Sequence, residues 1–448
     1  MLLKYMVDIP SLKGPTTPLW LQRMQVLFTP LEIWSEWGRL YGDNFQIGNE
    51  SPVVCLSSPD AIKTVLNASP EQISSCQSSQ PIKTLLGDNS ILFLDGKRHQ
   101  RERKLLMPMF HKESILQYNK IIHSTTEHAL NNLEKDRKIK IRILMNDITL
   151  SILLKAVFGL QHGERYIQLQ QVLQSIAAIF TNPVFSVISL FPAFQQPIGI
   201  WQEFLELQKQ LEKILLSEIN DRRSNKNSLG KDIFSLLISA KDELGYSLSE
   251  AEIRDELMTF VFAGYETTAA ALTWAIYWTY YQPYNFQKLS QETASCSLSQ
   301  PEEIAKLPFL NAMCQETLRL YPIAMNTFSR KTKRAIKIEN FILPPETNIN
   351  ISIFLAHRRE KTFSNADRFR PQRFLEKQFS PFEYLPFGGG DRRCLGASLA
   401  QQEMKLVLAN IVSKAKFEIV NPHLLRPVRY GMVMVPPNYL TMKLIDTF

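Results

Sequence analysis

The segment from Ser249 to Tyr281 limits the possible folds more than any other part of this 448-residue chain. Ser249-Glu-Ala-Glu252 has the pattern of a capping box, and the next proline is Pro283. A helix of this length spans roughly 50 Å at about 1.5 Å per residue. Beyond its first turns Glu266 is the only charged residue. A helix that is apolar on all sides predicts a position at the centre of a large helical core.

A membrane span is the alternative interpretation of such a helix, because its length would suffice. Its threonines and tyrosines, its central carboxylate and the lack of a second span argue against that alternative. The first ten residues are too short and too interrupted for a signal peptide or an anchor. The five cysteines are an odd number and form no C-x-x-C pair, which favours a reducing compartment. We therefore expect a soluble, cytoplasmic protein without a membrane anchor.

Hydrophobic periodicity elsewhere predicts a mainly α, multihelical fold with small β-sheets. An alternating pattern predicts a hairpin over 45–56 and two strands, 336–338 and 348–354, joined near Asn340. We see no internal repeat, and no series of alternating strands and helices that would indicate a parallel sheet. Helical spacing recurs at 31–40, 115–133, 145–158, 166–180 and 201–222.

The most informative local motif is the stretch Phe387-Gly-Gly-Gly-Asp-Arg-Arg-Cys-Leu-Gly396. Cys394 ends a glycine-rich loop, and a helical pattern follows at once. The helix N-terminus and the nearby Arg392 favour the thiolate form of the cysteine. Glycines such as Gly390 let backbone amides turn toward the sulfur, Phe387 can cover it, and Gly396 leaves room for a large flat group. An anionic sulfur with directed amides and an apolar cover describes an axial ligand of haem iron.

The pattern Phe-x-x-Gly-x-Arg-x-Cys-x-Gly resembles the haem-binding loop of the cytochrome P450 monooxygenases. The resemblance implies that Cys394 is the proximal ligand of a haem b iron and that Arg392 pairs with a haem propionate. It also places Phe387, Gly390 and Gly396 against the haem, beneath a long central helix, and implies a single domain of this family over residues 1–448. The alternative is a structural cysteine in a glycine loop, and the agreement at several positions favours the ligand.

The hexapeptide Ala263-Gly-Tyr-Glu-Thr-Thr268 lies in the middle of the long helix. Gly264 weakens the helix locally, and the Thr267 hydroxyl can bond the carbonyl of Ala263, so we expect a local bulge. The hexapeptide is similar to the central-helix motif of the same family, with Glu266 where Asp is more frequent. The resemblance implies that Glu266 and Thr267 form an acid–alcohol pair that delivers protons for O–O cleavage and that Ala263 contacts the haem. The alternative is a threonine-rich packing face with one stray carboxylate.

Glu316-Thr-Leu-Arg319 places an acid and a base three residues apart on one helix face. Together with Arg373 in Phe369-Arg-Pro-Gln-Arg-Phe374, it resembles the family's Glu-x-x-Arg helix and its partner segment. The implied role is structural, since this network would fix the cysteine loop.

By the same resemblance, His99 and Arg103 contact the haem propionates, with Arg330 as a weaker candidate. The net charge is +8, and basic residues concentrate at 97–104 and 392–393. No basic motif with interleaved aromatic residues suggests a nucleic-acid partner. We expect a positive face for an acidic electron donor, with an ordinary solvated run of charges as the alternative.

The segments that line the substrate pocket in the family are mostly apolar here, although the same residues could simply be core. They predict a hydrophobic small molecule such as a fatty acid or terpenoid, and Lys83 keeps a fatty acid possible. Residues 180–194 are a candidate lid. The candidate pocket residues are Leu86, Ile91, Phe180, Phe185, Phe262, Met325, Phe328 and Met434.

Three functions remain open at this point. The first is a monomeric haem-thiolate monooxygenase that takes electrons from a ferredoxin- or flavodoxin-like donor with its reductase. It would insert one atom of dioxygen into a C–H or C=C bond of its substrate, as in a hydroxylation. The second is an isomerase, dehydratase or peroxygenase of the same fold, against which the Glu266–Thr267 pair argues. The third is a haem sensor or carrier, which would need no substrate space.

Overall fold

The structure is a computed structural model that describes residues 12–48, 52–75, 83, 86–180, 182–190, 194–225, 229–298, 300–430 and 433–447. The chain forms two compact units, and each unit combines two stretches of sequence. The first unit comprises residues 1–77 and 318–394, and the second comprises residues 78–317 and 395–448. The prediction of one domain over residues 1–448 stays a prediction.

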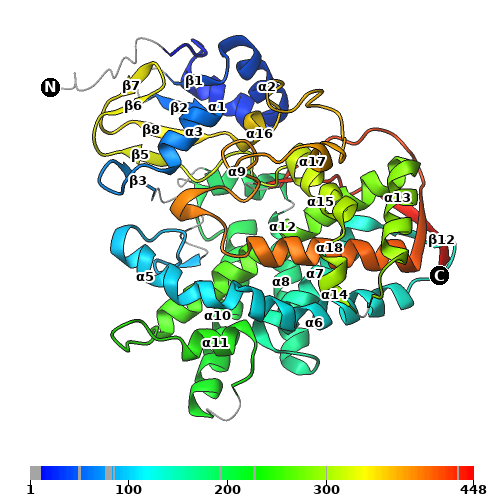
Figure 1. Ribbon diagram of the computed structural model, residues 1–448. Helices are drawn as coiled ribbons and strands as arrows, with labels where there is room; N and C mark the ends of the chain where they lie inside the picture. Colours follow the sequence, from blue (N-terminus) through cyan, green and yellow to red (C-terminus); the bar gives the residue numbers. More distant parts are fainter. Residues whose placement is uncertain are drawn as a thin grey trace. The chain divides into compact units, whose positions relative to one another are not determined.

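The first unit contains a five-stranded sheet with the order β1-β2-β8-β5-β3 (Figure 1). β1 and β2 form the predicted antiparallel hairpin, whose turn includes residues outside the described ones, and β2 pairs with β8 in parallel. The strands are β1 (Asn44–Ile47), β2 (Val53–Leu56), β3 (Ile73–Ser74), β5 (Arg330–Thr332) and β8 (Asn348–Ile351).

The predicted pairing of 336–338 with 348–354 is wrong. β6 (Ile336–Ile338) pairs instead with β7 (Phe341–Leu343), because Glu339 adopts a positive φ of 48° and the chain turns back at once. The segment 353–356 is the short helix α16, whose N-cap Ser352 accepts a hydrogen bond from the Leu355 amide.

Short helices cover this sheet and supply much of the first unit's apolar core. Ser58 caps α3 by accepting from the Ala61 amide, and Pro59 occupies the first helical position. Ile62 of α3 packs in one buried cluster with Leu56, Ile338 and other sheet residues. The helices are α1 (Leu19–Phe28), α2 (Pro30–Tyr41), α3 (Pro59–Leu66), α16 (Ile353–Ala356), α17 (Arg373–Glu376) and the end of α15 (Pro308–Leu320).

The second unit is built around α12 (Glu250–Tyr281), the helix that the sequence predicts. The capping box is present: Ser249 Oγ accepts from the Glu252 amide at 3.2 Å, and the Glu252 carboxylate accepts from the Ser249 amide at 2.8 Å. Trp274 and Tyr277 are fully buried. α7 (Ile141–Phe158) and α18 (Ala397–Lys414) pack against α12, and α6 (Lys112–Asn131) packs against α18 (Figure 1). The predicted central position of this helix within its unit is confirmed.

Further helices surround this centre, and two small sheets complete the unit. The sheets have the orders β4-β12-β9 and β10-β11. The helices are α5 (Gly96–Leu106), the 3₁₀ helix η1 (Met107–Phe110), α8 (Glu164–Phe180), α9 (Pro183–Leu190), α10 (Ile200–Ser224), α11 (Ile233–Ser239), α13 (Pro283–Ala294) and α14 (Pro301–Ile304), and α15 begins here. The strands are β4 (Lys138–Lys140), β9 (Ala415–Ile419), β10 (Val428–Tyr430), β11 (Val433–Val435) and β12 (Thr441–Thr447).

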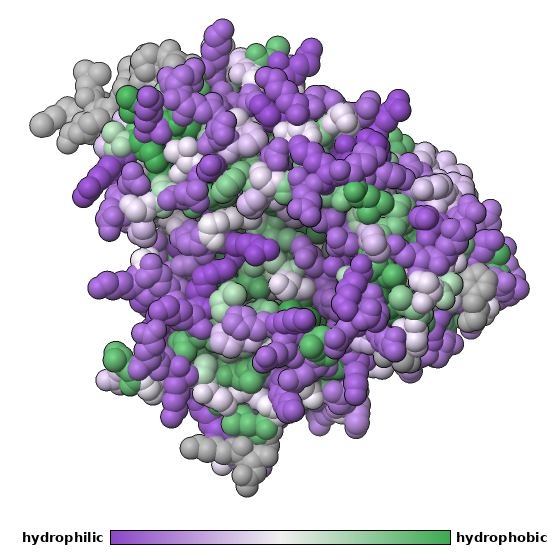
Figure 2. Space-filling view, viewed as in Figure 1, coloured by the Kyte–Doolittle hydropathy of each residue, from purple (hydrophilic) through white to green (hydrophobic). Residues whose placement is uncertain are grey.

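The predicted fold class, mainly α with small sheets, is confirmed by this element list. Within the described ranges, no helix combines the length and the apolar character that crossing a membrane requires. Figure 2 shows a mostly hydrophilic face on which hydrophobic residues form small scattered groups.

Candidate active site

Cys394 lies at the end of a loop whose backbone is fixed by local hydrogen bonds. Its amide donates to the carbonyl of Phe387 at 3.0 Å, and the Arg393 amide donates to the carbonyl of Gly390 at 3.2 Å. Gly388 and Gly390 both have φ of +68°, the left-handed region that favours glycine. Cys394 is exposed, and α18 begins three residues later. Cys394 is therefore an accessible residue on a hydrogen-bonded loop that leads directly into a helix N-terminus.

The glycines of this loop also permit its close approach to α3. A Cβ on Gly389 would lie 2.6 Å from Leu66 Cδ1, and a Cβ on Gly390 would lie 3.0 Å from the Leu66 carbonyl oxygen. Arg330 of β5, one of the predicted propionate contacts, is buried, and its Nη2 donates to the Gly389 carbonyl at 3.2 Å. Burial lowers the pKa of this guanidinium. Arg330 thus holds the cysteine loop, and its contact with a propionate stays a prediction.

Two arginines of the predicted structural network meet in the first unit. Nη2 of Arg319 and Nη2 of Arg373 both donate to the carbonyl of Arg368 at 3.2 Å. Both side chains are buried, and Arg319 Nη1 also donates to the carbonyl of His357 at 2.7 Å. Glu316 is buried three residues earlier on α15 and belongs to the second unit, so its place in the network stays a prediction.

His357 extends this network to the cysteine loop, and the sequence analysis missed it. Its Nδ1 lies 3.2 Å from the Arg319 carbonyl oxygen, and the Leu385 amide donates to its Nε2 at 2.9 Å. An Nε2 that accepts requires the neutral ring with its proton on Nδ1. Burial, followed by the charge of Arg319, lowers the pKa of His357 to about 3. A single histidine without a motif gave no signal in the sequence.

The acid–alcohol pair lies on α12 in the second unit. Thr267 Oγ1 donates to the Ala263 carbonyl at 2.6 Å, as expected, but the helix continues without a bulge. The predicted bulge is wrong, because a carbonyl has a second lone pair and can accept the hydroxyl while keeping its helical bond. Ala263 is exposed, although many of its helical neighbours are buried. Ala263, Glu266 and Thr267 share one helix face through their spacing of three and four residues.

Gly264 has a packing role that the sequence analysis did not anticipate. A Cβ at this position would lie 2.6 Å from Leu153 Cδ1 of α7. The missing side chain therefore lets α7 and α12 approach closely just beside the acid–alcohol pair.

Glu266 is held by two residues of α7 that the sequence analysis missed. Its Oε1 accepts from Asn146 Nδ2 at 3.0 Å, and its Oε2 lies 3.4 Å from Arg142 Nη2. The Glu266 side chain is only 12% exposed. Burial raises the pKa of its carboxyl, and the charge of Arg142 opposes that rise. Glu266 is therefore a largely buried acid. Burial favours its protonated form, and the charge of Arg142 favours its ionised form.

Comparison with known proteins identifies the family. The family model described as Cytochrome P450 matches residues 14–443. The chain is a cytochrome P450. It is 29% identical over 401 residues to cytochrome P450 135B1 of Mycobacterium bovis, a match that covers 89% of this chain and 84% of the relative. It is 30% identical over 415 residues to cytochrome P450 135A1 of Mycobacterium tuberculosis, with coverages of 91% and 89%.

A solved structure supports the fold of this cytochrome P450. The retinoic-acid-bound cyanobacterial CYP120A1 matches with a TM-score of 0.85 and 21% identity over 98% of this chain and 99% of that one. The enzyme is thus an oxidoreductase of the monooxygenase family, and haem b is its cofactor. The family takes hydrophobic substrates and electrons from a redox partner.

The residues around Cys394 fit a haem-thiolate ligand. The thiol is exposed, whereas the thiols of Cys55 and Cys314 are buried. Among the described residues, a Cβ on Gly396 would meet only a Phe110 ring carbon at 4.0 Å, so the residue before α18 has open space around it. Arg392 lies within this loop, two residues before Cys394, and its side chain is 6% exposed. The cofactor roles of Cys394, Phe387, Gly390, Arg392 and Gly396 remain predictions that this geometry supports.

α5 of this cytochrome P450 carries the predicted propionate contacts His99, which is buried, and Arg103, which is partly buried. Two of its other cations, Arg101 and Lys104, form ion pairs within the second unit. Arg101 Nε lies 2.7 Å from Asp242, and Lys104 Nζ lies 3.0 Å from Glu243. The predicted positive face is therefore reduced along α5 by neighbouring carboxylates.

Three predicted pocket residues form an aromatic cluster in the second unit. Phe180 lies 5.1 Å from Phe185 and 5.7 Å from Phe262 between ring centroids. Phe204 and Tyr430 also contact Phe180, and the sequence analysis missed both. Phe185 is almost fully buried, whereas Phe180 and Phe262 are partly buried and can offer ring surface to a ligand. Met434 of β11 is buried.

The segment before α5 is tied to the start of α12. The Asp255 carboxylate accepts from the Asn89 amide at 2.9 Å, and the Glu256 carboxylate accepts from the Ile91 amide at 2.6 Å. Leu86 and Ile91, two candidate pocket residues, are therefore held in buried positions. Residue 85 of the candidate segment 85–92, and part of the candidate lid, lie outside the described residues.

The two remaining pocket candidates, Met325 and Phe328, belong to the first unit. Lys83, which kept a fatty acid possible as substrate, belongs to the second unit. Met325 is buried, and Phe328 is 43% exposed. Lys83 forms an ion pair with Asp88 at 2.8 Å, which lowers the pKa of that carboxyl. Its charge is thus matched within the second unit.

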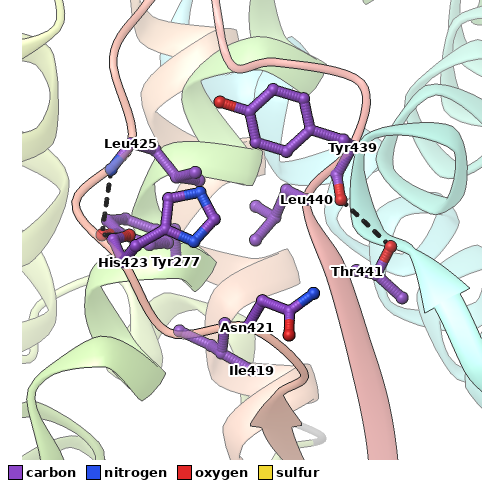
Figure 3. A pocket seen from close by; sticks show the side chains of 8 residues that line it. All are labelled: Tyr277, Ile419, Asn421, His423, Leu425, Tyr439, Leu440 and Thr441. Atoms are coloured by element: carbon purple, nitrogen blue, oxygen red, sulfur yellow. Dashed lines mark hydrogen bonds between the residues drawn. The ribbon is translucent and has the colours of Figure 1, made fainter.

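A separate hollow lies beside the C-terminal end of α12 (Figure 3). Tyr277, about three helical turns beyond Glu266, forms part of its wall, and the rings of His423 and Tyr439 stack at its edge. None of the predicted site residues lines it. The lining residues are Tyr277, Ile419, Asn421, His423, Leu425, Tyr439, Leu440 and Thr441.

Proposed function

We propose that this cytochrome P450 holds haem b through Cys394 and inserts one atom of dioxygen into a hydrophobic small molecule. The observation that carries the proposal is the exposed Cys394 on a loop that contains two glycines with left-handed φ. A thiolate ligand donates electron density to the iron and favours O–O cleavage, which is the chemistry that bound haem supplies. Arg392, His99, Arg103 and Arg330 are the proposed contacts of the propionates.

The proposed proton path uses Glu266 and Thr267. Glu266 is buried, and its raised pKa lets the carboxyl hold a proton closer to neutral pH than an exposed acid would. Thr267 Oγ1 donates to the Ala263 carbonyl, which leaves its lone pairs available to accept a hydrogen bond. To pass on its own proton, the hydroxyl must rotate away from that carbonyl. The exposed Ala263 leaves open space on the same helix face.

The proposed substrate is a flat or chain-like apolar molecule, such as a fatty acid or terpenoid. The partly buried rings of Phe180 and Phe262 support this class, because aromatic faces bind apolar ligands and exclude water. The structural relative CYP120A1 binds retinoic acid, which is an apolar chain with a carboxylate. A panel of terpenoids, retinoids and fatty acids should include a compound that shifts the Soret band by displacing the sixth ligand of the iron.

The electron donor that we propose is a separate acidic protein of the ferredoxin or flavodoxin type, served by its own reductase. The net charge of +8 supports this choice, because opposite charges speed the encounter of two proteins. We propose a monomer that works in the cytoplasm.

The test of the proposed ligand is the reduced carbonyl spectrum of Cys394→Ser. The variant should lose the red-shifted Soret band, whereas Cys296→Ser, at a partly exposed cysteine in the α13–α14 connection, should keep it. An unchanged band in Cys394→Ser would refute the assignment. A protein that binds no haem under ample supply would remove the proposed function altogether.

An isomerase, dehydratase or peroxygenase of the same fold is the second candidate. The observation that favours it is that Glu266 and Thr267 are both hydrogen-bonded within the protein. Turnover that requires dioxygen and an electron donor supports the monooxygenase. Turnover with peroxide alone, or without any oxidant, supports the alternative.

A further inference from the structure

Arg142, the second residue of α7, joins the acid on α12 to the C-terminal region of the second unit. Its side chain is 5% exposed, and Nη2 lies 3.4 Å from Glu266 Oε2. Its other terminal nitrogen, Nη1, donates to Asn438 Oδ1. The guanidinium carbon lies 4.8 Å from the ring centroid of Tyr430. One buried cation thus contacts three separate stretches of the second unit.

We infer that Arg142 is a positioning residue that sets the charge and orientation of Glu266, with Asn438 and Tyr430 as its anchors. The inference rests on the proposed role of Glu266 as the proton-delivering acid. Proton delivery by Glu266 would then depend on α7, which carries Arg142, on β10, which carries Tyr430, and on the loop after β11, which carries Asn438. Arg142 therefore acts through Glu266 and not through direct contact with a substrate or a cofactor.

The bond lengths indicate that Glu266 can exchange partners. The contact to Arg142 at 3.4 Å is longer than the 2.7–2.9 Å of a close charge-assisted bond, whereas Asn146 donates at 3.0 Å. Arg142 Nε and Asn146 Oδ1 are buried and make no hydrogen bond to the described residues. Unused donors and acceptors beside the carboxylate allow a second arrangement in which Glu266 keeps Asn146 and leaves Arg142.

The electrostatics explain why this single cation decides the charge of Glu266. Among the described residues, the titratable groups that interact with Glu266 are Arg142 of α7, Tyr265 of α12 and Tyr430 of β10. The two tyrosines are neutral near pH 7, because burial raises the pKa of both. In the described part of the chain, Arg142 is therefore the only positive charge that opposes the effect of burial on the Glu266 carboxylate.

The anchors make Arg142 sensitive to the C-terminal hairpin formed by β10 and β11. Tyr430 ends β10 and also contacts Phe180 of the aromatic cluster, and Asn438 follows β11. A ligand that moves Phe180 or Met434 would act on the residues that hold the guanidinium. Substrate contact could thus reach Glu266 through residues of the second unit alone.

The experiment is an infrared titration of Glu266 in the holoenzyme. The Glu266 carboxyl signal is isolated by subtracting the spectrum of Glu266→Gln, and it is followed in Arg142→Gln, Arg142→Lys and Arg137→Gln. Loss of the cation should raise the titration midpoint by about one pH unit or more, and Arg142→Lys should restore most of the shift. Arg137, whose side chain is 61% exposed, is the matched control and should leave the midpoint unchanged.

Coupling of product formation to consumed reducing equivalents is the second readout. Arg142→Gln should lower it several-fold, and Asn438→Ala, which removes only the anchor, should lower it less. An unmoved midpoint in Arg142→Gln, equal shifts in the Gln and Lys variants, or a shifted midpoint with full coupling would overturn the inference. If the reduced carbonyl band shows that Cys394 is not the ligand, the proposed function fails, while the infrared titration still decides the role of Arg142.

Discussion

Thr267 and Thr268 are neighbours with the same local bond, which makes them a matched pair at the scale of single residues. Thr267 Oγ1 donates to the Ala263 carbonyl, and Thr268 Oγ1 donates to the Gly264 carbonyl. Thr267 is partly exposed, whereas Thr268 is buried. Only the exposed hydroxyl can take part in proton transfer to a ligand.

We predict that Thr267→Ala keeps its haem but releases reducing equivalents as peroxide, with coupling reduced about tenfold or more, because general acid steps contribute factors of about 10²–10⁴. Thr268→Ala should stay coupled. The measurement is product and peroxide formed per reducing equivalent. Full coupling in Thr267→Ala, or equal losses in both variants, would contradict the proton role.

His357 gives a prediction about stability because it must stay neutral to accept from the Leu385 amide. Its pKa falls to about 3 in the folded protein, against an ordinary value near 6.5. Between these values the unfolded chain binds more protons than the folded one, so the free energy of unfolding decreases as pH falls from about 6.5 toward 3, by at most about 1.4 kcal/mol per pH unit.

We predict that His357→Gln loses about 1–3 kcal/mol at pH 7, because the buried Arg319 carbonyl and Leu385 amide lose partners. Its unfolding free energy should also depend less steeply on pH between 4 and 6.5. Denaturant unfolding across this range measures both effects, with the exposed His423→Gln as control. A variant that keeps the wild-type slope would show that His357 is not the titrating group.

At this scale the sequence predicts residues that belong to a compact motif and misses those that do not. Cys394, Glu266 and Thr267 stand in patterns whose spacing itself implies chemistry. Arg142 and His357 act through partners that are distant in the sequence, 124 residues away for Glu266 and 38 for Arg319. Nothing local distinguishes such residues from ordinary surface or core positions.

At the scale of elements, the contact between α7 and α12 depends on one missing side chain. Gly264 faces Leu153, which is 6% exposed. Alanine at 264 would gain about 1 kcal/mol of helix propensity. An added methyl in a packed core costs about 1–3 kcal/mol, because the end of the Leu153 side chain, whose Cδ1 would lie 2.6 Å from the new Cβ, must shift.

We therefore predict that Gly264→Ala destabilises the protein by about 1 kcal/mol. Leu153→Ala alone should cost about 2–5 kcal/mol. The double variant should lose less than the two single losses together, because the truncated Leu153 makes room for the new methyl. Denaturant unfolding of the four proteins gives the coupling energy. Strictly additive losses would mean that the two side chains do not compete for space.

Elements with a strong pattern were predicted well, and those set by long-range pairing were not. The capping box and proline-free run placed α12 within a residue of its observed bounds. The pairing of β6 was wrong because β8 has a competing partner, β2, almost 300 residues earlier in the chain. Alternation predicts that a strand exists but does not say which strand it joins.

At the scale of the whole molecule, the two units carry different parts of the proposed chemistry. The cysteine loop and the arginine–histidine network belong to the first unit, and the acid–alcohol pair and the aromatic cluster belong to the second. Each unit combines two stretches that are far apart in the sequence. Local patterns therefore could not predict which stretches belong to the same unit. The family resemblance supplied what periodicity alone could not.

The net charge of +8 is a property of the whole protein and should affect its encounter with a charged electron donor. Electrostatic attraction between opposite charges weakens as salt shortens the Debye length from about 14 Å at 50 mM toward 4 Å at 500 mM. Reduction by an acidic ferredoxin should therefore slow several-fold over this range, whereas reduction by dithionite should change much less. A rate that is constant or rises with salt would exclude an acidic donor.

Two lysine variants distinguish the effect of a local positive surface on the reduction rate from the effect of the overall net charge. Lys97 is exposed at the start of α5, and Lys416 is exposed on β9. Lys97→Glu and Lys416→Glu lower the net charge equally, but only Lys97 lies on the helix to which the donor face is assigned. We expect Lys97→Glu to slow reduction at 50 mM salt by about three- to tenfold, with the difference vanishing at 500 mM as screening removes it. Equal effects of both variants would mean that the donor responds to overall charge and not to a surface at α5.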